Sequence, residues 1–150
     1  MTTDIAACAR DERVVLFALL WETTARLARD LDLEMEARGA VPLAWFEVML
    51  RLEEAPEGHL RMTEVADAIV HSSGGTTRLV DRLEEAGLVA RQLCPSDRRA
   101  IHVALTDAGR ERLAQSKLAH IAFLDSRLAQ RLDAAERAQL LQLLGALNAG

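Results

Sequence analysis

Near the middle of the chain, a group of short polar residues precedes two arginines, and this combination suits contact with nucleic acid. The polar group comprises Ser72, Ser73, Gly74, Thr76 and Thr77. Arg78 and Arg82 follow, four residues apart, so they would share one face of a helix. Small polar residues at a helix start let the backbone approach the major groove, where all four base pairs can be distinguished. An ordinary helix cap uses the same residue types, so the neighbouring segments must decide between the two interpretations.

A second candidate for contact is the polar turn Cys94-Pro95-Ser96-Asp97-Arg98-Arg99. It lies between two strand-like segments, residues 88–93 and 100–105, and would form the tip of a β-hairpin. Arg98 and Arg91 are predicted to contact phosphates there. A solvated charged turn is the alternative.

These residues would be positioned by a helix, a turn, a second helix and the hairpin. Residues 62–69 are predicted to form a short helix, and the segment His71-Ser72-Ser73-Gly74-Gly75 interrupts the helical pattern. A second helix follows over residues 76–86, with Gly87 as its C-terminal stop. Helix, turn, helix and hairpin in this order predict a winged helix-turn-helix.

Long helices are predicted on both sides of this unit. Residues 11–38 carry apolar side chains every three or four positions, and Thr106 is suited to cap a helix that runs to about residue 131. Asp133 and Glu136 predict a capping-box start for the last helix. The expected fold class is therefore mainly α with a small β-hairpin wing. The flanking helices carry more apolar surface than one lobe needs, which predicts an all-helical homodimer interface.

Five short segments follow one another in the order of a known family. They are Glu64-Val65-Ala66, Arg78-Leu79-Val80-Asp81-Arg82-Leu83-Glu84, Gly87-Leu88-Val89, Asp97-Arg98-Arg99 and Leu105-Thr106-Asp107-Ala108-Gly109. Together they resemble the MarR family of winged-helix transcription regulators, from about Trp45 to Leu113. The flanking helices match in length and order only. Arg61 departs from the family pattern, which usually has a Thr or Ser cap there, so this helix start is expected to be weaker or to be capped in another way.

The resemblance implies a single domain over residues 1–150. Residues 42–105 would form the DNA-binding lobe, while residues 10–38 and 106–150 would form the helical dimerisation region. In this arrangement Arg99 enters the minor groove and Asp97 orients it through a charge-assisted hydrogen bond. The implied DNA-binding residues are Ser72, Ser73, Gly74, Thr76, Thr77, Arg78, Arg82, Asp97, Arg98 and Arg99.

The function implied by the resemblance is a sequence-specific transcriptional repressor that binds a pseudo-palindromic DNA operator as a homodimer. Members of the family often bind small aromatic acids or other lipophilic compounds between the two lobes. Trp21, Trp45 and Met49 are candidates to line such an effector site, although each is also explained as a core residue.

Two alternatives stay open at this point. One is a thiol-based redox-sensing regulator of the same fold, using Cys94, which has arginines nearby that favour the thiolate, or Cys8. The other is a winged-helix module that contacts proteins instead of DNA. The polar start of the second helix and the Asp97 and Arg99 pair favour DNA.

The net charge of −5 seems to argue against a nucleic-acid partner. The acidic excess is local, however. Residues 1–71 hold 7 arginines against 14 acidic residues, whereas residues 72–105 hold 5 arginines against 4. The sequence therefore predicts an acidic N-terminal helical region beside a mildly basic winged helix.

The composition and motifs of the chain argue against several other classes of protein. Two cysteines cannot form a disulfide framework or a four-thiolate zinc site. No phosphate loop, nucleophile elbow or metal motif is present, so neither an enzyme nor a cofactor or metal site is expected. The N-terminus lacks a basic signal-peptide start, and no apolar run of about 18 residues occurs. A cytoplasmic protein without a membrane partner is the expectation.

Overall fold

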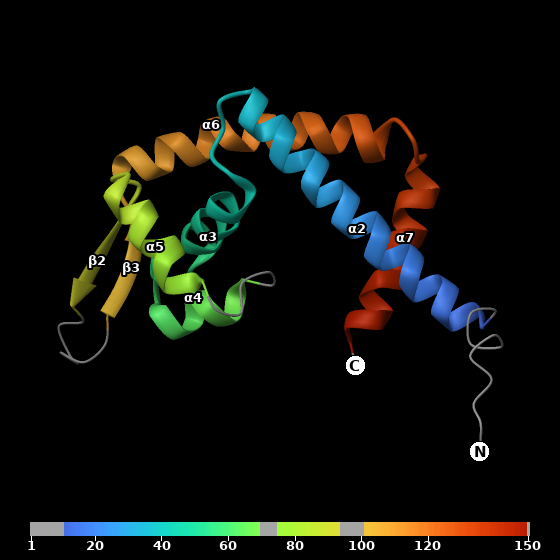
Figure 1. Ribbon diagram of the computed structural model, residues 1–150, viewed down its shortest axis with the longest axis horizontal. Coiled ribbons are helices and arrows are strands. Elements are labelled where there is room, and N and C mark those ends of the chain that lie inside the picture. Colours follow the sequence, from blue (N-terminus) through green and yellow to red (C-terminus); the bar gives the residue numbers. More distant parts are fainter. Residues whose placement is uncertain (1–10, 70–74, 94–100, 150) are drawn as a thin grey trace, which may run out of the picture.

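The computed structural model describes residues 11–69, 75–93 and 101–149. Within these ranges the chain is mainly helical with one small sheet, which confirms the predicted fold class (Figure 1). The helices are α2 (Glu12–Ala37), α3 (Leu43–Glu54), α4 (Met62–Ala68), α5 (Thr76–Glu85), α6 (Asp107–Leu124) and α7 (Ala134–Asn148). The strands are β1 (His59–Arg61), β2 (Val89–Leu93) and β3 (Ile101–Leu105), and a π-helical turn, η1 (Asp125–Ala129), follows α6.

The three strands form an antiparallel sheet in the order β1-β3-β2. The predicted hairpin is present, with Val89 opposite Leu105 and Leu93 opposite Ile101. Strand β1 was not predicted, because three residues are too few to show the alternation of a strand. It pairs through Leu60 with Val103 of β3 and brings the chain back to the sheet just before α4.

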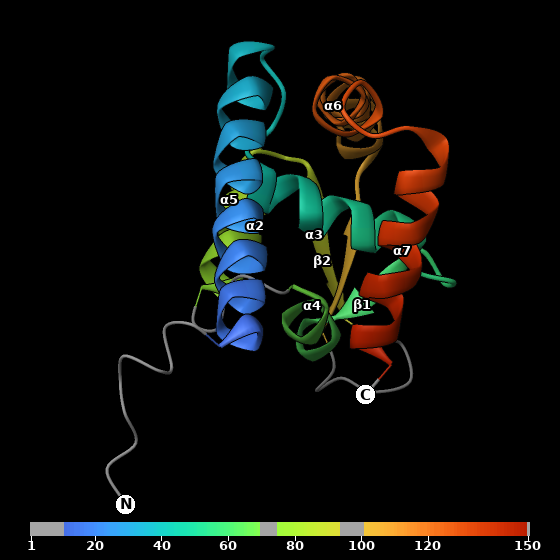
Figure 2. The ribbon, with the colours of Figure 1, turned by 90° about the vertical axis from the view of Figure 1, so that its right-hand side faces the viewer.

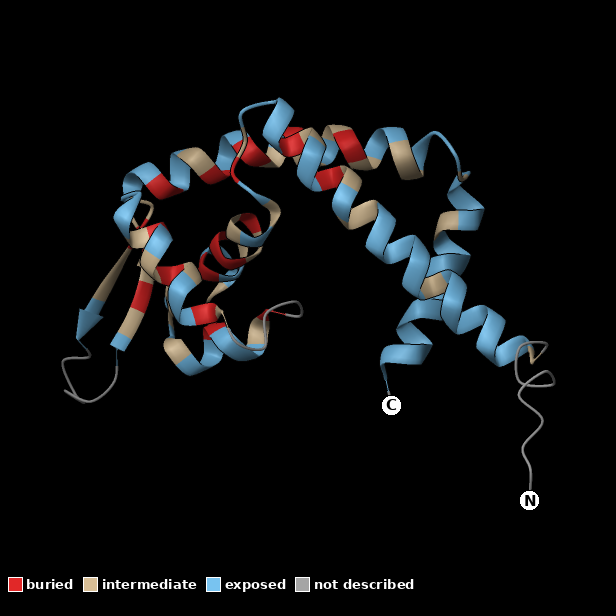
Figure 3. Cartoon of the chain, viewed as in Figure 1, coloured by how far each residue is buried: buried red, intermediate tan, exposed pale blue. Residues whose placement is uncertain are grey.

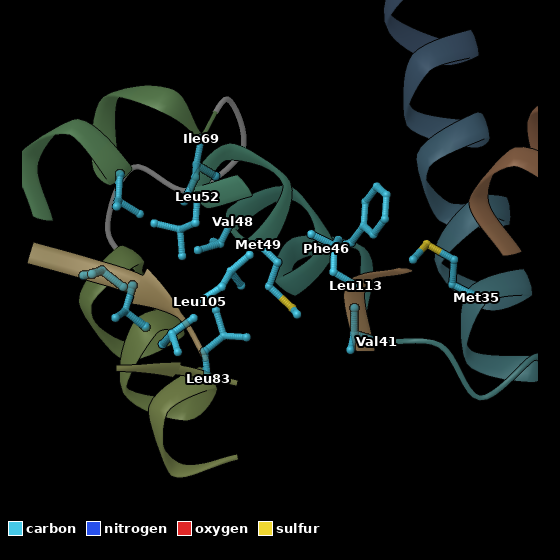
Figure 4. Packing of buried hydrophobic residues seen from close by; sticks show 14 of the residues in the cluster. Met35, Val41, Phe46, Val48, Met49, Leu52, Ile69, Leu83, Leu105 and Leu113 are labelled. Carbon is cyan, nitrogen blue, oxygen red and sulfur yellow. The ribbon is translucent and has the colours of Figure 1, made fainter. Parts of the chain in front are cut away.

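One hydrophobic core joins the helices to the sheet. Val48, Met49 and Leu52 of α3 meet Leu83 of α5 and Leu105 of β3 inside the winged-helix lobe (Figure 4). The same core continues through Phe46 and Leu113 to Met35 of α2, so α3 and α6 connect the lobe to the long N-terminal helix. Packing contacts as well as the covalent chain therefore join the winged-helix lobe to α2 and α6.

Helix caps explain where several elements begin. The Arg61 N–H donates to the Glu64 carboxylate at 2.7 Å, so the third residue of α4 satisfies the helix start in place of the missing Ser or Thr. This confirms that α4 is capped in another way than the family pattern. Asp133 accepts from the Glu136 N–H at 2.9 Å while Glu136 accepts from the Asp133 N–H at 2.8 Å, which confirms the predicted capping box of α7.

Two helical arms extend away from the winged-helix lobe. The N-terminal half of α2 and all of α7 cross in Figure 1, but the perpendicular view in Figure 2 shows them apart. No residue of α7 is buried (Figure 3). We call these two segments the arms. Their exposed apolar residues are Val14, Val15, Leu16, Phe17, Leu19, Trp21, Leu140, Leu141, Leu143, Leu144 and Leu147.

Candidate nucleic-acid interface

Helix α5 has one face in the core and one face in solvent. Val80 and Leu83 are fully buried, whereas Thr77, Arg78 and Arg82 are exposed. Within the described ranges no carboxylate lies within ion-pair distance of Arg78 or Arg82. The structure thus places both predicted arginines on the outer face of α5, with their charges available to an anionic partner. Thr76 is instead buried at the start of the helix.

Arg91 of β2, predicted from the sequence to contact phosphate, is held by α5 in the structure. Its guanidinium donates to the Glu84 carboxylate and to the Asp81 carboxylate, each at 2.6 Å. Its backbone N–H also donates to Glu84, at 3.0 Å. With two carboxylates around one guanidinium, the local net charge is −1, and the Arg91 pairs hold the wing against the helix.

The Arg91 contact changes the acidity of its partner. The pKa of the Glu84 carboxyl lies below its ordinary value, mainly because the Arg91 backbone N–H and then its guanidinium donate hydrogen bonds to the ionised form. The pKa of Arg91 is raised, because its hydrogen bonds to Glu84 and Asp81 outweigh the desolvation of its guanidinium. The pair is therefore fully ionised at neutral pH.

A second set of contacts fixes the end of α5 on α6. Thr106 caps α6 as predicted, accepting from the Gly109 N–H at 2.9 Å, and its hydroxyl donates to the Gly87 carbonyl at 2.7 Å. Its backbone N–H donates to the Leu88 carbonyl. A Cβ on Gly109 would lie 1.9 Å from that Leu88 oxygen, so only glycine allows this approach. The segment Leu105-Thr106-Asp107-Ala108-Gly109 is therefore a docking joint between the lobe and α6.

The three candidate effector residues do not form one site. Trp21 lies on the wall of a cavity between α2 and α3. Trp45 faces a different surface hollow, together with Leu79 and Arg82. Met49 is completely buried in the core of the lobe. Sequence spacing alone does not show that α3 turns these last two residues toward different surroundings.

Several predicted residues lie outside the described ranges. They are Ser72, Ser73, Gly74, Asp97, Arg98 and Arg99 of the proposed interface, and both cysteines, Cys8 and Cys94. Among the described residues, no group of three His, Cys, Asp or Glu side chains is arranged to hold a metal ion. In the same residues no helix is long and apolar enough to span a membrane.

Sequence comparison places this arrangement among known regulators. Residues 41–100 match the model of the MarR family. The uncharacterized HTH-type transcriptional regulator YdgJ of Bacillus subtilis is 30% identical over 118 residues, covering 79% of this chain and 70% of YdgJ. The chain belongs to the MarR family. Another relative, the transcriptional repressor MprA of Escherichia coli, is 26% identical over 104 residues, and the match spans 69% of this chain but only 58% of MprA.

Solved MarR-family structures have the same fold as this chain. Sco3205 of Streptomyces coelicolor, in complex with DNA, has a TM-score of 0.80 at 27% identity, covering 93% of this chain and 86% of Sco3205. A mutant of MarR from E. coli, complexed with operator DNA, has a TM-score of 0.79 at 26% identity, with 91% and 96% of the two chains covered. The similarity extends over the arms as well as the winged-helix lobe.

Proposed function

We propose that this protein is a transcriptional repressor that binds a pseudo-palindromic operator as a homodimer. The observation that carries the proposal is the exposed face of α5, where Arg78 and Arg82 have no carboxylate partner among the described residues. The planar guanidinium of arginine can donate two parallel hydrogen bonds, which suits both guanine edges and phosphates. The DNA complexes of Sco3205 and MarR, and the name of the repressor MprA, support the same interpretation.

The proposed interface combines the helix and the wing. Thr77, Arg78 and Arg82, with Thr76 and the segment Ser72 to Gly74 before them, would approach the major groove. Arg99 at the wing tip would enter the minor groove, oriented by Asp97, with Arg98 on the backbone. Residues 42–105 would thus form the DNA-binding lobe.

The homodimer is proposed from the arms. Large apolar side chains are normally buried, yet Phe17 is 67% exposed and Leu141 is 72% exposed in the single chain. A twofold partner packed against the arms, within the dimerisation region of residues 10–38 and 106–150, would bury these side chains and set the spacing of two half-sites. We further propose that a small lipophilic effector releases the operator by favouring a different relative orientation of the two lobes.

The direct experiment is selection of bound sequences from a random DNA pool, followed by titration of the selected duplex at several salt concentrations. We expect a two-half-site sequence with inverted repeats and affinity that falls as salt rises. Selection that yields no shared sequence, or a single half-site without a repeat, would contradict the proposal.

A further inference from the structure

A cavity lies where the α2 arm meets the winged-helix lobe. Its volume is about 460 Å³, and its wall comes from the middle of α2, the turn at Pro42 and the first turns of α3. The wall is mainly apolar, with Ala25, Ala28, Leu43 and Ala44 contributing. Cavities of roughly this size hold small organic ligands. The question is which charge such a ligand would carry.

Trp21 gives the cavity an aromatic face. The side chain lies on the cavity wall, is largely exposed, and stacks on Phe17 with ring centroids 6.4 Å apart. The indole face carries the negative end of the ring quadrupole and is the best protein partner for an organic cation.

Glu47 of α3 gives the cavity a carboxylate without a counter-ion. Its side chain is half-buried, and in the part of the chain that the structure describes it has no hydrogen bond or ion pair. Arg51, one helical turn further on, is paired with Glu54 at 3.1 Å. A half-buried carboxylate that makes no ion pair interacts favourably with a positively charged ligand.

The other charges on the wall do not reverse this preference. Asp32 accepts from the Leu43 N–H at 2.7 Å and so offsets the partial positive charge at the start of α3. Arg29 is a cation on the same wall, but it is exposed and its long side chain reaches water. The cavity wall itself carries two carboxylates, Asp32 and Glu47, against the single arginine Arg29, so its net charge is negative.

We propose that this cavity binds a lipophilic cation, an amine or quaternary ammonium group attached to an aromatic ring, with Glu47 and Trp21 as its recognition residues. The inference rests on the proposed effector response and names the charge of the effector. The positive charge proposed for this ligand is opposite in sign to the charge of the aromatic acids that the family resemblance suggests. Because one wall belongs to the arm and the other to the lobe, an occupied cavity would change how the two are held together.

The test compares three probes that share one ring system and differ in charge: 2-naphthylmethylammonium, 2-naphthamide and 2-naphthoate. Binding to the full chain is measured by calorimetry at pH 7 without DNA. We expect the cation to bind about tenfold more tightly than the amide, and the carboxylate to bind most weakly. Glu47→Gln should remove the preference for the cation while leaving amide binding in place.

Glu36→Gln is the matched control, because it removes the same charge from α2 at an exposed position outside the cavity. It should leave the tenfold preference intact. Trp21→Leu should weaken binding of the cation more than binding of the amide, since only the cation is attracted by the indole quadrupole.

The inference is overturned if the amide or the carboxylate binds as tightly as the cation. It is also overturned if none of the probes binds at about 1 mM, or if a folded Glu47→Gln protein keeps the preference. The ranking of probes on the unaltered protein needs no variant, so it decides the matter even where a substitution impairs folding. Since DNA is absent, failure here is separate from failure of the selected duplex to bind.

Discussion

The Arg91 guanidinium joins β2 of the wing to helix α5, with Nη1 donating to Oε2 of Glu84 at 2.6 Å. The Arg91 side chain is only 22% exposed and also holds Asp81, so β2 is tied to two points on α5. This geometry fixes the angle between the two elements proposed to contact DNA. Arg91 therefore acts on binding by positioning other residues.

Replacing Arg91 should therefore weaken DNA binding although its guanidinium is occupied by two carboxylates of α5. We expect Arg91→Met to lower operator affinity about tenfold without changing the slope of affinity against salt, because no phosphate contact is lost. Arg51→Met, which breaks the exposed pair with Glu54, is the control and should bind normally. A reduced salt slope for Arg91→Met would show that Arg91 contacts phosphate after all.

The same pair predicts a pH dependence of stability. The folded pKa of Glu84 is lowered, so its contribution to stability is present above the unfolded value of 4.5 and is lost as pH falls through the folded pKa. Because Glu84 is well exposed, the contribution is about 1 kcal/mol at most. Denaturant unfolding at equal protein concentration should show Arg91→Met less stable than the unaltered protein at pH 7 and closer to it at pH 3. An equal difference at both pH values would contradict this assignment.

Arg78 and Arg82 should contribute directly to the interface. Arg82→Ala, as a phosphate contact, should weaken binding to all sequences alike and reduce the salt slope by about 1. Arg78→Ala should cost about 1–3 kcal/mol if its guanidinium reads a base, and should relax selection at one position of each half-site. Arg110→Ala removes an exposed arginine of α6 and serves as the control. Unchanged binding by both α5 variants would contradict the docking of this helix.

The docking joint predicts a sharp effect of one added methyl group. Gly109→Ala would place Cβ 1.9 Å from the Leu88 carbonyl oxygen, and backbone atoms must move to relieve the clash. We expect a loss of about 2 kcal/mol in the free energy of unfolding despite the better helix propensity of alanine. Gly75→Ala adds the same methyl at the start of α5, where it would meet no atom within 4 Å, and should cost clearly less. Equal unfolding temperatures of the two variants would show that the docking joint accommodates the methyl group without loss of stability.

The arms predict the oligomeric state. Leu141→Lys places a charge on the exposed apolar face of α7 and should shift the protein from dimer to monomer in light scattering at micromolar concentration. Glu85→Lys, at an exposed position of α5 in the DNA-binding lobe, should leave the dimer unchanged. A stable monomer of the unaltered protein under the same conditions would refute the dimer itself.

The sequence by itself determined the elements and their order. Helix periodicity, the glycine stops and the Thr106 and Asp133 caps depend on neighbours along the chain, so local chemistry is enough to predict them. The grouping of polar residues and arginines around α5 is likewise a local signal. The short strand β1 was missed because its only support is pairing with β3, a segment distant in sequence.

Only the tertiary structure decided what each side chain faces. Arg91 looked like a phosphate contact, yet two carboxylates of α5 enclose it once β2 packs beside that helix. Met49 and Trp45 are neighbours on α3, yet one fills the core while the other meets a surface hollow. Side-chain roles of this kind depend on which elements pack together, and burial and charge pairing between distant segments have no signature in local spacing.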